Sequence, residues 1–540
     1  MEQTRKKLLV VADLGGSPPD LRTLAELADV YVYIPRPSAV TARYMEDVGR
    51  YAHGVLKERT ACPPGGYEHP ASVTFTGARP YTLTEEQLAD RIAEAAVLFG
   101  ADGILFGGAE NIVLSVAKAA ERLGLRSAGV HGAVQARGKL EMRQAFRAGG
   151  APGPDFRPIY GERDLAAAAR ELGYPLVLKP TYLACSIGVT RLDGSRDPAE
   201  VFREVQASLG SSEEDRLLFG GECLFLAETY MEGCAEDWYG ELAPLYGDYV
   251  SVEGMMVDGV YHPVAITDKA PQHSEFTETA HLVPSALDAE AQRIIVEACR
   301  LANEALGLRT CPTHTEVKLL KGRRVGIIET AARFGGWNIV PQLRDVYGID
   351  MTRAWALAVL YGSANGLPPS ALREAPSARC NLRLYLEDDA RTQVGGAYVY
   401  AGYEREGLLP DGVRLAAEQE LPVGSVVRRV AGQNAMSFVS TLQLEAERPQ
   451  ALAAAVRRIR SAVRLRLAAA DGAAGLAAAE APGEGAAAEA SAGAAGLAAA
   501  ETPGEGAAAE ASAGARPAAA AEGEPEPARD GQPLQESFSF

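Results

Sequence analysis

The 540-residue sequence predicts an α/β fold with more than one domain, and three observations lead to this prediction. The chain is long enough to form two or more domains with sizeable cores. The segment GADGILFGGAENIVLSVAKAAERLGL (100–125) is typical of a strand followed by an amphipathic helix, which is a βα unit. The segment EGMMVDGVYHPVAI (253–266) is typical of a β-hairpin with Asp258-Gly259 at its turn.

The composition is that of a soluble globular protein, with 47% hydrophobic and 23% charged residues. The longest apolar runs, such as LLVVA (8–12), are too short to cross a bilayer, and no signal peptide follows the charged N-terminus. We therefore expect a cytoplasmic enzyme without a membrane partner. The seven cysteines show no CxxC spacing, which argues against a zinc site or a disulfide framework.

The C-terminal segment, residues 471–540, has a different composition from the rest of the chain. The 21 residues 472–492 recur at 493–513 with one change, from Ala481 to Thr502. Residues 472–540 contain 11 acidic residues and two arginines, a net charge of −9, which is half of the −18 of the whole chain. Such a sequence cannot bury enough apolar surface to fold, so we expect a disordered tail. Both the tail and the rest of the chain are negatively charged, so we do not expect nucleic acid as a partner.

The N-terminal region predicts an open α/β domain over residues 1–133. KKLLVVADLGGSPPDL (6–21) is a strand that runs into glycines, but Pro18 and Pro19 stand where a dinucleotide fold needs its third glycine and its helix. Glu110 follows the second strand at the edge where α/β sheets bind ligands. An equally good interpretation is that Glu110 stands at a helix N-terminus, where the helix dipole favours a negative charge.

Two lysines lie about 40 residues apart in segments suited to binding an anion. Lys139 begins a short helix that Gly149-Gly150 ends. Lys179 ends a strand, and a loop of small residues that includes Cys185 and Ser186 follows it. Small side chains let backbone N–H groups approach an anion closely. Either lysine alone could equally be an ordinary surface charge.

Three further elements are predicted from residue patterns. LFLAETYMEG (224–233) is an apolar strand that stops at Glu228, where main-chain groups, Tyr230 and Met231 could hold a purine. Residues 288–306 form an amphipathic helix. An arginine-rich helix ends near Leu467.

The segment THTEVKLLKGRRVGIIETAARFGGWN (313–338) predicts two strands joined by a short basic turn. A turn centred between Gly322 and Arg323 places Glu316 opposite Glu329. Opposed carboxylates repel unless a proton or a cation lies between them, and hard oxygen ligands suit Mg²⁺. The alternative is a solvated hairpin with both glutamates in water.

Seven segments together resemble the ATP-grasp superfamily and, within it, the L-amino-acid ligases of the bacilysin synthetase type. They are VVADLGG, YIPRPSAVTA, LKPTYLACSIGVT, SVEGMMVDG, FTETAH, THTEVKL and AARFGGWN. The resemblance runs from about residue 8 to Asn338, extends more loosely to about residue 467, and does not include the tail. It implies an ATP-grasp fold with an N-terminal α/β domain (1–133), a small lid domain (134–226) and a C-terminal metal-binding catalytic domain (227–470).

The resemblance also implies roles for individual residues. The phosphates of ATP would contact Lys139, Lys179, Cys185 and Ser186. The adenosine would contact Glu228, Thr229, Tyr230, Met231 and Gln272. Glu316 and Glu329 would bind Mg²⁺, with two ions expected, although Ala331 stands where the superfamily commonly has an asparagine ligand. Glu110, His281, Arg333 and Trp337 would contact the amino-acid substrates, and Arg333 and His281 would serve catalysis.

The function that the resemblance implies is the ATP-dependent joining of two free L-amino acids into an α-dipeptide through an aminoacyl phosphate. Trp337 would restrict the N-terminal residue to a small one, whereas hydrophobicity alone favours a core tryptophan at this position. One alternative is a carboxylate–amine ligase that acts on a peptide or on a non-amino-acid substrate. Another is a catalytically silent nucleotide-binding protein. The oligomeric state is left open, with a homodimer as one option.

Overall fold

In the part of the chain that the structure describes, the strands form four sheets. The computed structural model describes residues 5–13, 19–35, 42–58, 83–107, 110–182, 186, 188–208, 225–272, 275–368, 375, 377–429 and 437–469. All of these residues belong to one structural unit, Met1–Ala499. None of the helices among them is long and apolar enough to span a membrane.

The first sheet is parallel and has the strand order β3-β2-β1-β4. Its strands are β1 (Lys7–Ala12), β2 (Asp29–Ile34), β3 (Ala52–Lys57) and β4 (Gly103–Gly107). The accompanying helices are α1 (Leu21–Leu27), α2 (Ala42–Tyr51), α4 (Glu85–Phe99), α5 (Glu110–Arg122) and α6 (Val130–Arg137). Four consecutive residues of β1, Leu8 to Val11, are fully buried, as expected for a parallel strand covered on both faces. The predicted βα unit is confirmed as β4 followed by α5.

The second sheet is antiparallel, with the order β5-β8-β6-β7. Its strands are β5 (Phe156–Ile159), β6 (Leu176–Pro180), β7 (Thr190–Leu192) and β8 (Phe225–Thr229). The helices of this region are α7 (Lys139–Gly149), α8 (Glu162–Leu172) and α9 (Pro198–Ser208). Side chains of β5, β6, β8, α8 and α9 form a hydrophobic core of their own, separate from the main core. As predicted, Lys139 begins α7 and Gly150 caps its end.

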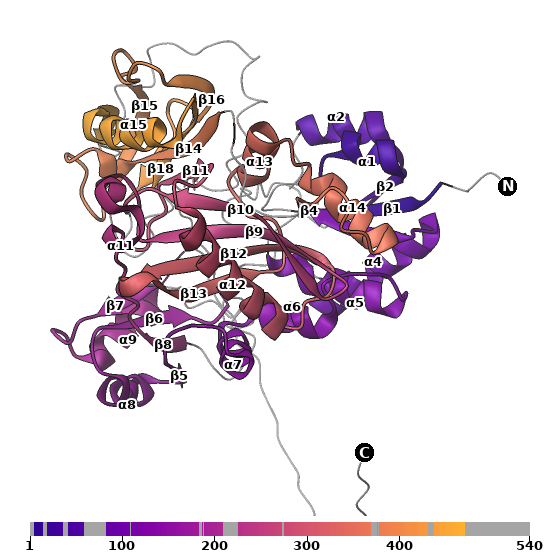
Figure 1. Ribbon diagram of the computed structural model, residues 1–540, viewed down its shortest axis with the longest axis horizontal. Helices are drawn as coiled ribbons and strands as arrows, with labels where there is room; N and C mark the ends of the chain where they lie inside the picture. Colours follow the sequence, from indigo (N-terminus) through magenta and orange to yellow (C-terminus); the bar gives the residue numbers. More distant parts are fainter. Residues whose placement is uncertain are drawn as a thin grey trace, which may run out of the picture. The chain divides into compact units, whose positions relative to one another are not determined.

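The third sheet has eight strands in the order β13-β12-β9-β10-β11-β14-β18-β16 (Figure 1). They are β9 (Tyr249–Val257), β10 (Val260–Lys269), β11 (Ala280–Val283), β12 (Cys311–Leu320), β13 (Arg324–Ala331), β14 (Ala378–Tyr385), β16 (Arg414–Glu420) and β18 (Phe438–Ala446). The helix α11 (Glu236–Tyr239) and the 3₁₀ helix η2 (Gly240–Leu245) precede β9. The predicted hairpin is β9–β10, and the positive φ angles of Asp258 (47°) and Gly259 (88°) fit the turn that was expected.

Helix α12 (Ala289–Ala305) confirms the predicted amphipathic helix and packs against β9, β10, β12 and β13. Asp288 caps its first turn by accepting a hydrogen bond from Ala291 N. After β13 come α13 (Ile339–Tyr347), α14 (Met351–Tyr361) and, after β14, the 3₁₀ helix η4 (Leu386–Asp388).

The fourth sheet, β17-β15-β19, corrects one prediction. Its strands are β15 (Ala397–Tyr403), β17 (Val426–Arg428) and β19 (Leu465–Ala469). The arginine-rich helix is α15 (Pro449–Ala462), so it does not continue to Leu467. Val463 adopts a non-helical conformation (φ −57°, ψ 136°), and Leu465 is buried where it pairs with Tyr403. Tertiary strand pairing therefore outweighs the helical pattern of this segment.

Candidate active site

The edge of the eight-stranded sheet brings the two predicted metal ligands together. Glu316 of β12 pairs with Glu329 of β13, which confirms the predicted pairing, but the turn differs from the one expected. Leu320 pairs with Arg324, so the turn is centred on Gly322, whose φ is 71°. A register shift after Glu316 adds one residue to β13 and restores the opposition of the two glutamates.

Positive side chains surround Glu329. Lys139 Nζ lies 3.4 Å from Glu329 Oε2. Burial by itself raises the pKa of the carboxyl group, but the charges of Lys139, Lys179 and Arg333 outweigh it and lower the pKa to about 2. Glu329 is therefore ionised at neutral pH and faces Glu316 across the two strands.

The other predicted lysine is paired with a carboxylate of the second sheet. Lys179 Nζ lies 2.8 Å from Glu228 Oε2, and Arg143 Nε donates to Glu228 Oε1 at 2.7 Å. Burial opposes ionisation of Glu228, yet Arg143 and Lys179 hold its pKa below the ordinary value. Burial, together with the nearby charge of Arg143, lowers the pKa of Lys179 to about 8. Arg143 Nη2 also donates to Ile328 O at 2.6 Å, which ties α7 to the residue before Glu329.

The segment predicted to hold the purine lies at the end of β8. The N–H groups of Thr229 and Tyr230 already donate to the carbonyl groups of Asp155 and Pro175, at 2.9 and 3.0 Å. The ring of Tyr230 faces the Arg191 guanidinium group at 4.5 Å. These two amides are thus engaged within the protein, which leaves later main-chain groups for a purine.

The four remaining predicted nucleotide contacts do not share one environment. Met231 Sδ packs against Gly326 of β13. A Cβ atom added at Gly326 would lie only 2.3 Å from this sulfur. Gln272 Oε1 accepts a hydrogen bond from Phe276 N at 3.3 Å. Ser186 is exposed and has a φ of 56°, while Cys185 lies outside the described residues.

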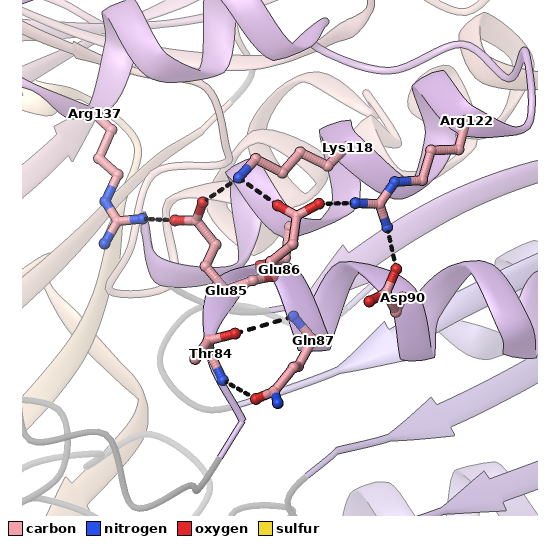
Figure 2. Close-up of polar contacts among 9 residues, drawn as sticks. Thr84, Glu85, Glu86, Gln87, Asp90, Lys118, Arg122 and Arg137 are labelled. Carbon is pink, nitrogen blue, oxygen red and sulfur yellow. Dashed lines mark hydrogen bonds and ion pairs between the residues drawn. The ribbon is translucent and has the colours of Figure 1, made fainter.

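Two predicted substrate residues meet although 223 positions separate them in the sequence. Arg333 Nε lies 2.8 Å from Glu110 Oε1, at the start of α5. Figure 2 shows how α5 is held: Glu85 of α4 contacts Lys118 of α5 at 2.8 Å and Arg137 of α6 at 2.7 Å. This network fixes α5, and with it Glu110, relative to its neighbouring helices.

His281 is buried in a polar cluster that the sequence did not reveal. Its Nε2 lies 2.7 Å from Glu278 Oε1, and Lys269 Nζ lies 2.5 Å from the same oxygen. Burial lowers the pKa of His281 to about 4 despite the charge of Glu278, so the imidazole is neutral at pH 7. Lys269 is completely buried. It reaches this cluster because β10 pairs with β11, so that Lys269 lies opposite His281.

Trp337 lies against His281, with 4.3 Å between the ring centroids. The Arg383 guanidinium group is also 4.0 Å from the indole centroid. Asn381 Nδ2 donates to Trp337 O at 2.9 Å, and the φ of Trp337 is 54°. Trp337 is partly exposed and is not a core residue, unlike Trp355, which is 2% exposed. Sequence patterns gave no sign of Asn381 and Arg383 because neither belongs to a recognised segment.

The two opposed glutamates fit a magnesium site that is completed by non-protein ligands. No group of three or more His, Cys, Asp or Glu side chains arranged to hold a metal occurs among the described residues. Mg²⁺ commonly takes one or two carboxylates together with substrate phosphates and water. The ionised Glu329 and its partner Glu316 match that requirement.

Comparisons with known proteins place this geometry in a family. Residues 172–340 match the ATP-grasp domain model. The chain is 41% identical over 384 residues, 71% of its length, to the alanine–anticapsin ligase of Bacillus subtilis (strain 168), of which it covers 80%. The chain belongs to the ATP-grasp L-amino-acid ligases. It is therefore an ATP-grasp ligase that forms dipeptides, and ATP-grasp enzymes use ATP with Mg²⁺.

Solved structures support the ATP-grasp fold of this ligase. The L-amino acid ligase from Bacillus licheniformis superimposes with a TM-score of 0.64 at 19% identity, over 86% of this chain and 99% of that one. The biotin carboxylase domain of 2-oxoglutarate carboxylase from Hydrogenobacter thermophilus, solved with MgADP, gives a TM-score of 0.54 at 17% identity, over 86% and 92% of the two chains. At these identities the likeness concerns the fold alone.

Proposed function

We propose that this ligase joins two free L-amino acids into an α-dipeptide and favours a small residue on the N-terminal side. One observation carries the proposal: Arg333 and Trp337 lie on the same loop, where Arg333 meets Glu110 and Trp337 meets His281. The loop thus brings together a carboxylate with a guanidinium group and an imidazole with an indole, and Arg333 is near enough to Glu329 for its charge to lower the pKa of that carboxyl group.

The reaction has two steps. The carboxylate of the first amino acid attacks the γ-phosphorus of ATP, which releases ADP and forms an aminoacyl phosphate. The amine of the second amino acid then attacks the acyl carbon, a C–N bond forms, the C–O bond to phosphate breaks, and the amine loses a proton. Two Mg²⁺ ions, bound through Glu316 and Glu329, would offset charge on the transferring phosphoryl group.

We infer that ATP binds between the lid (134–226) and the catalytic domain (227–470). Lys139, Lys179, Cys185 and Ser186 would contact its phosphates. Glu228, Thr229, Tyr230, Met231 and Gln272 would surround the adenosine. The buried Glu228 contributes by fixing Lys179, because its carboxylate is already occupied by two cationic side chains.

Four residues would act on the amino acids. Glu110 would bind the ammonium group of the first substrate, and Arg333 would stabilise the oxyanion of the tetrahedral intermediate. With a pKa of about 4, His281 is a weak base, which favours orientation of the incoming amine over its deprotonation. Trp337, held between His281 and Arg383, would exclude large side chains from the first site.

The test is to mix the full chain with ATP, Mg²⁺ and pairs of L-amino acids, and to measure phosphate release together with product masses. The proposal predicts phosphate release that requires two amino acids, and dipeptides whose N-terminal residue is glycine, alanine or serine. Phosphate release only with peptides or with acids that lack an amino group would contradict it.

A further inference from the structure

A buried carboxylate that the proposed mechanism does not use lies beside the two candidate metal ligands. Glu253 is in the middle of β9 and is 1% exposed. Its Oε1 lies 2.6 Å from His314 Nδ1, and its Oε2 accepts a hydrogen bond from Gly335 N at 3.3 Å. Ser251 Oγ donates to Oε1 at 3.3 Å. A buried carboxylate is costly unless it is paired in this way, so its contacts indicate what it holds in place.

Two rows of residues cross strands β9, β12 and β13 on this face of the sheet. One row is Ser251, Glu316 and Glu329, and the next is Glu253, His314 and Ala331. Alternate residues of a strand point to the same face, so both rows share it. His314 Nε2 lies 3.7 Å from Glu316 Oε1. The imidazole of His314 therefore connects Glu253 with the candidate metal ligand.

Glu253 also contacts the loop that carries Arg333 and Trp337. Gly335 lies midway between these two residues in the sequence. A Cβ atom at Gly335 would lie 2.8 Å from both Glu253 Oε2 and His314 Nδ1, which is closer than side chains tolerate. The absence of a side chain at Gly335 thus permits the close approach of the loop to the carboxylate.

We propose that Glu253 is a positioning residue for the ligase reaction. One of its oxygens orients His314 against Glu316, and the other fixes the backbone between Arg333 and Trp337. This inference rests on the proposed roles of Glu316 and Arg333. Glu253 does not touch the reacting atoms; it sets the distance between the metal-binding strand and the loop that stabilises the oxyanion. Displacements of about 1 Å in such groups can reduce turnover by about 100-fold.

Glu253→Gln tests the inference because a carboxamide keeps the shape but has only one oxygen to accept hydrogen bonds. We expect kcat to fall by about 10- to 100-fold, whereas the affinity for ADP measured without Mg²⁺ stays at the wild-type value. Asp268→Asn is the matched control. Asp268 is a fully buried carboxylate on the neighbouring strand β10, where it accepts hydrogen bonds from Ser285 Oγ at 2.6 Å and Ala286 N at 2.7 Å. Its variant should keep the wild-type kcat.

Gly335→Ala keeps the test decisive if Glu253→Gln does not fold, because it disturbs the same contact from the loop and should also lower kcat. If Glu253→Gln folds, replacing Glu253 in the background of His314→Asn should cost less than it does alone, because both residues act in one chain of contacts. A folded Glu253→Gln enzyme with wild-type kcat would overturn the inference, as would an equal loss in Asp268→Asn. A wild-type enzyme that forms no dipeptide would instead refute the proposed function.

Discussion

Two clusters of charged residues lie on either side of Arg143 and differ in how completely their carboxylates are paired. Glu228 is 4% exposed, and Arg143 and Lys179 occupy both of its oxygens. Glu329 has a 38% exposed side chain, one lysine at 3.4 Å and another carboxylate opposite it. Arg143 also holds the carbonyl group of Ile328 and so joins the two clusters.

The difference separates a carboxylate that fixes Lys179 from two carboxylates that a metal ion could reach. A buried carboxylate with two cationic partners fixes the protein around it and has little capacity for another cation. Glu316 and Glu329 face each other and keep partly exposed side chains, while Lys139, Lys179 and Arg333 hold Glu329 ionised. Their partners and exposure therefore make these two glutamates, and not Glu228, the candidate metal ligands.

The largest expected effects come from replacing one glutamate of each cluster. Glu228→Gln leaves two buried cations without a full counter-charge, so we expect the free energy of unfolding to fall by about 3 to 5 kcal/mol. Glu329→Gln removes a partly exposed ion pair, so that free energy should fall by only about 1 kcal/mol or less, while kcat falls by about 100-fold or more. Denaturant unfolding and phosphate release at saturating Mg²⁺ measure both quantities. Equal losses of stability in the two variants would show that Glu228 and Glu329 do not differ in their contribution to the fold.

The ion pair between Glu228 and Lys179 also predicts how activity depends on pH. The lowered pKa of Lys179 means that its ammonium group is present below pH 8 and is lost as the pH rises through about 8. Because kcat/KM reports the free enzyme, its value for ATP should fall above this pH, by up to about tenfold per pH unit. Lys179→Arg keeps the charge and should remove the fall. A kcat/KM profile that stays flat through pH 9 would show that Lys179 does not bind the phosphates as a cation.

A smaller effect concerns Trp337, which we propose restricts the N-terminal substrate to small residues. Trp337→Ala should raise kcat/KM for leucine or phenylalanine as the N-terminal residue by about tenfold or more, because a steric barrier is removed. ATP use should persist. Trp355→Phe is the control, since Trp355 lies in the core and should affect stability without widening specificity. If a folded Trp337→Ala enzyme still accepts only small N-terminal residues, Trp337 does not impose this restriction.

The smallest effect is expected from the tail. A chain that ends at Asp471 retains every described residue, including β19, and both clusters. Its melting temperature and turnover should equal those of the full chain because the removed residues lack the large apolar side chains that form a core. A marked fall in kcat on truncation would mean that the tail contributes to the active site.

Local patterns predicted much of this fold. The β9–β10 hairpin follows from Asp258-Gly259, and α12 follows from the amphipathic pattern of residues 288–306. The Glu316–Glu329 pairing was also predictable, although the register shift that produces it was not, because a bulge depends on contacts such as that between Arg143 and Ile328. Residues 465–467 were mistaken for helix because their strand partner, β15, is more than 60 residues away.

The site was predictable where the end of a strand or helix, or the family resemblance, singled out a residue. Glu253, Lys269 and Arg383 escaped notice because their significance arises from neighbours on other strands. Glu253 stood in a predicted strand as an ordinary residue until β12 and the Gly335 loop were placed around it. Burial and ion pairing between distant segments are tertiary properties that local sequence patterns do not encode.

Mn²⁺ binding can show whether Glu316 and Glu329 together form the metal site. Mn²⁺ can replace Mg²⁺ and is followed by electron paramagnetic resonance in the presence of ADP. We expect the wild-type enzyme to bind Mn²⁺, and we expect Glu316→Gln and Glu329→Gln each to weaken this binding by at least about tenfold, whereas Glu253→Gln weakens it less. Unchanged Mn²⁺ affinity in both glutamine variants would mean that the two glutamates do not bind the metal.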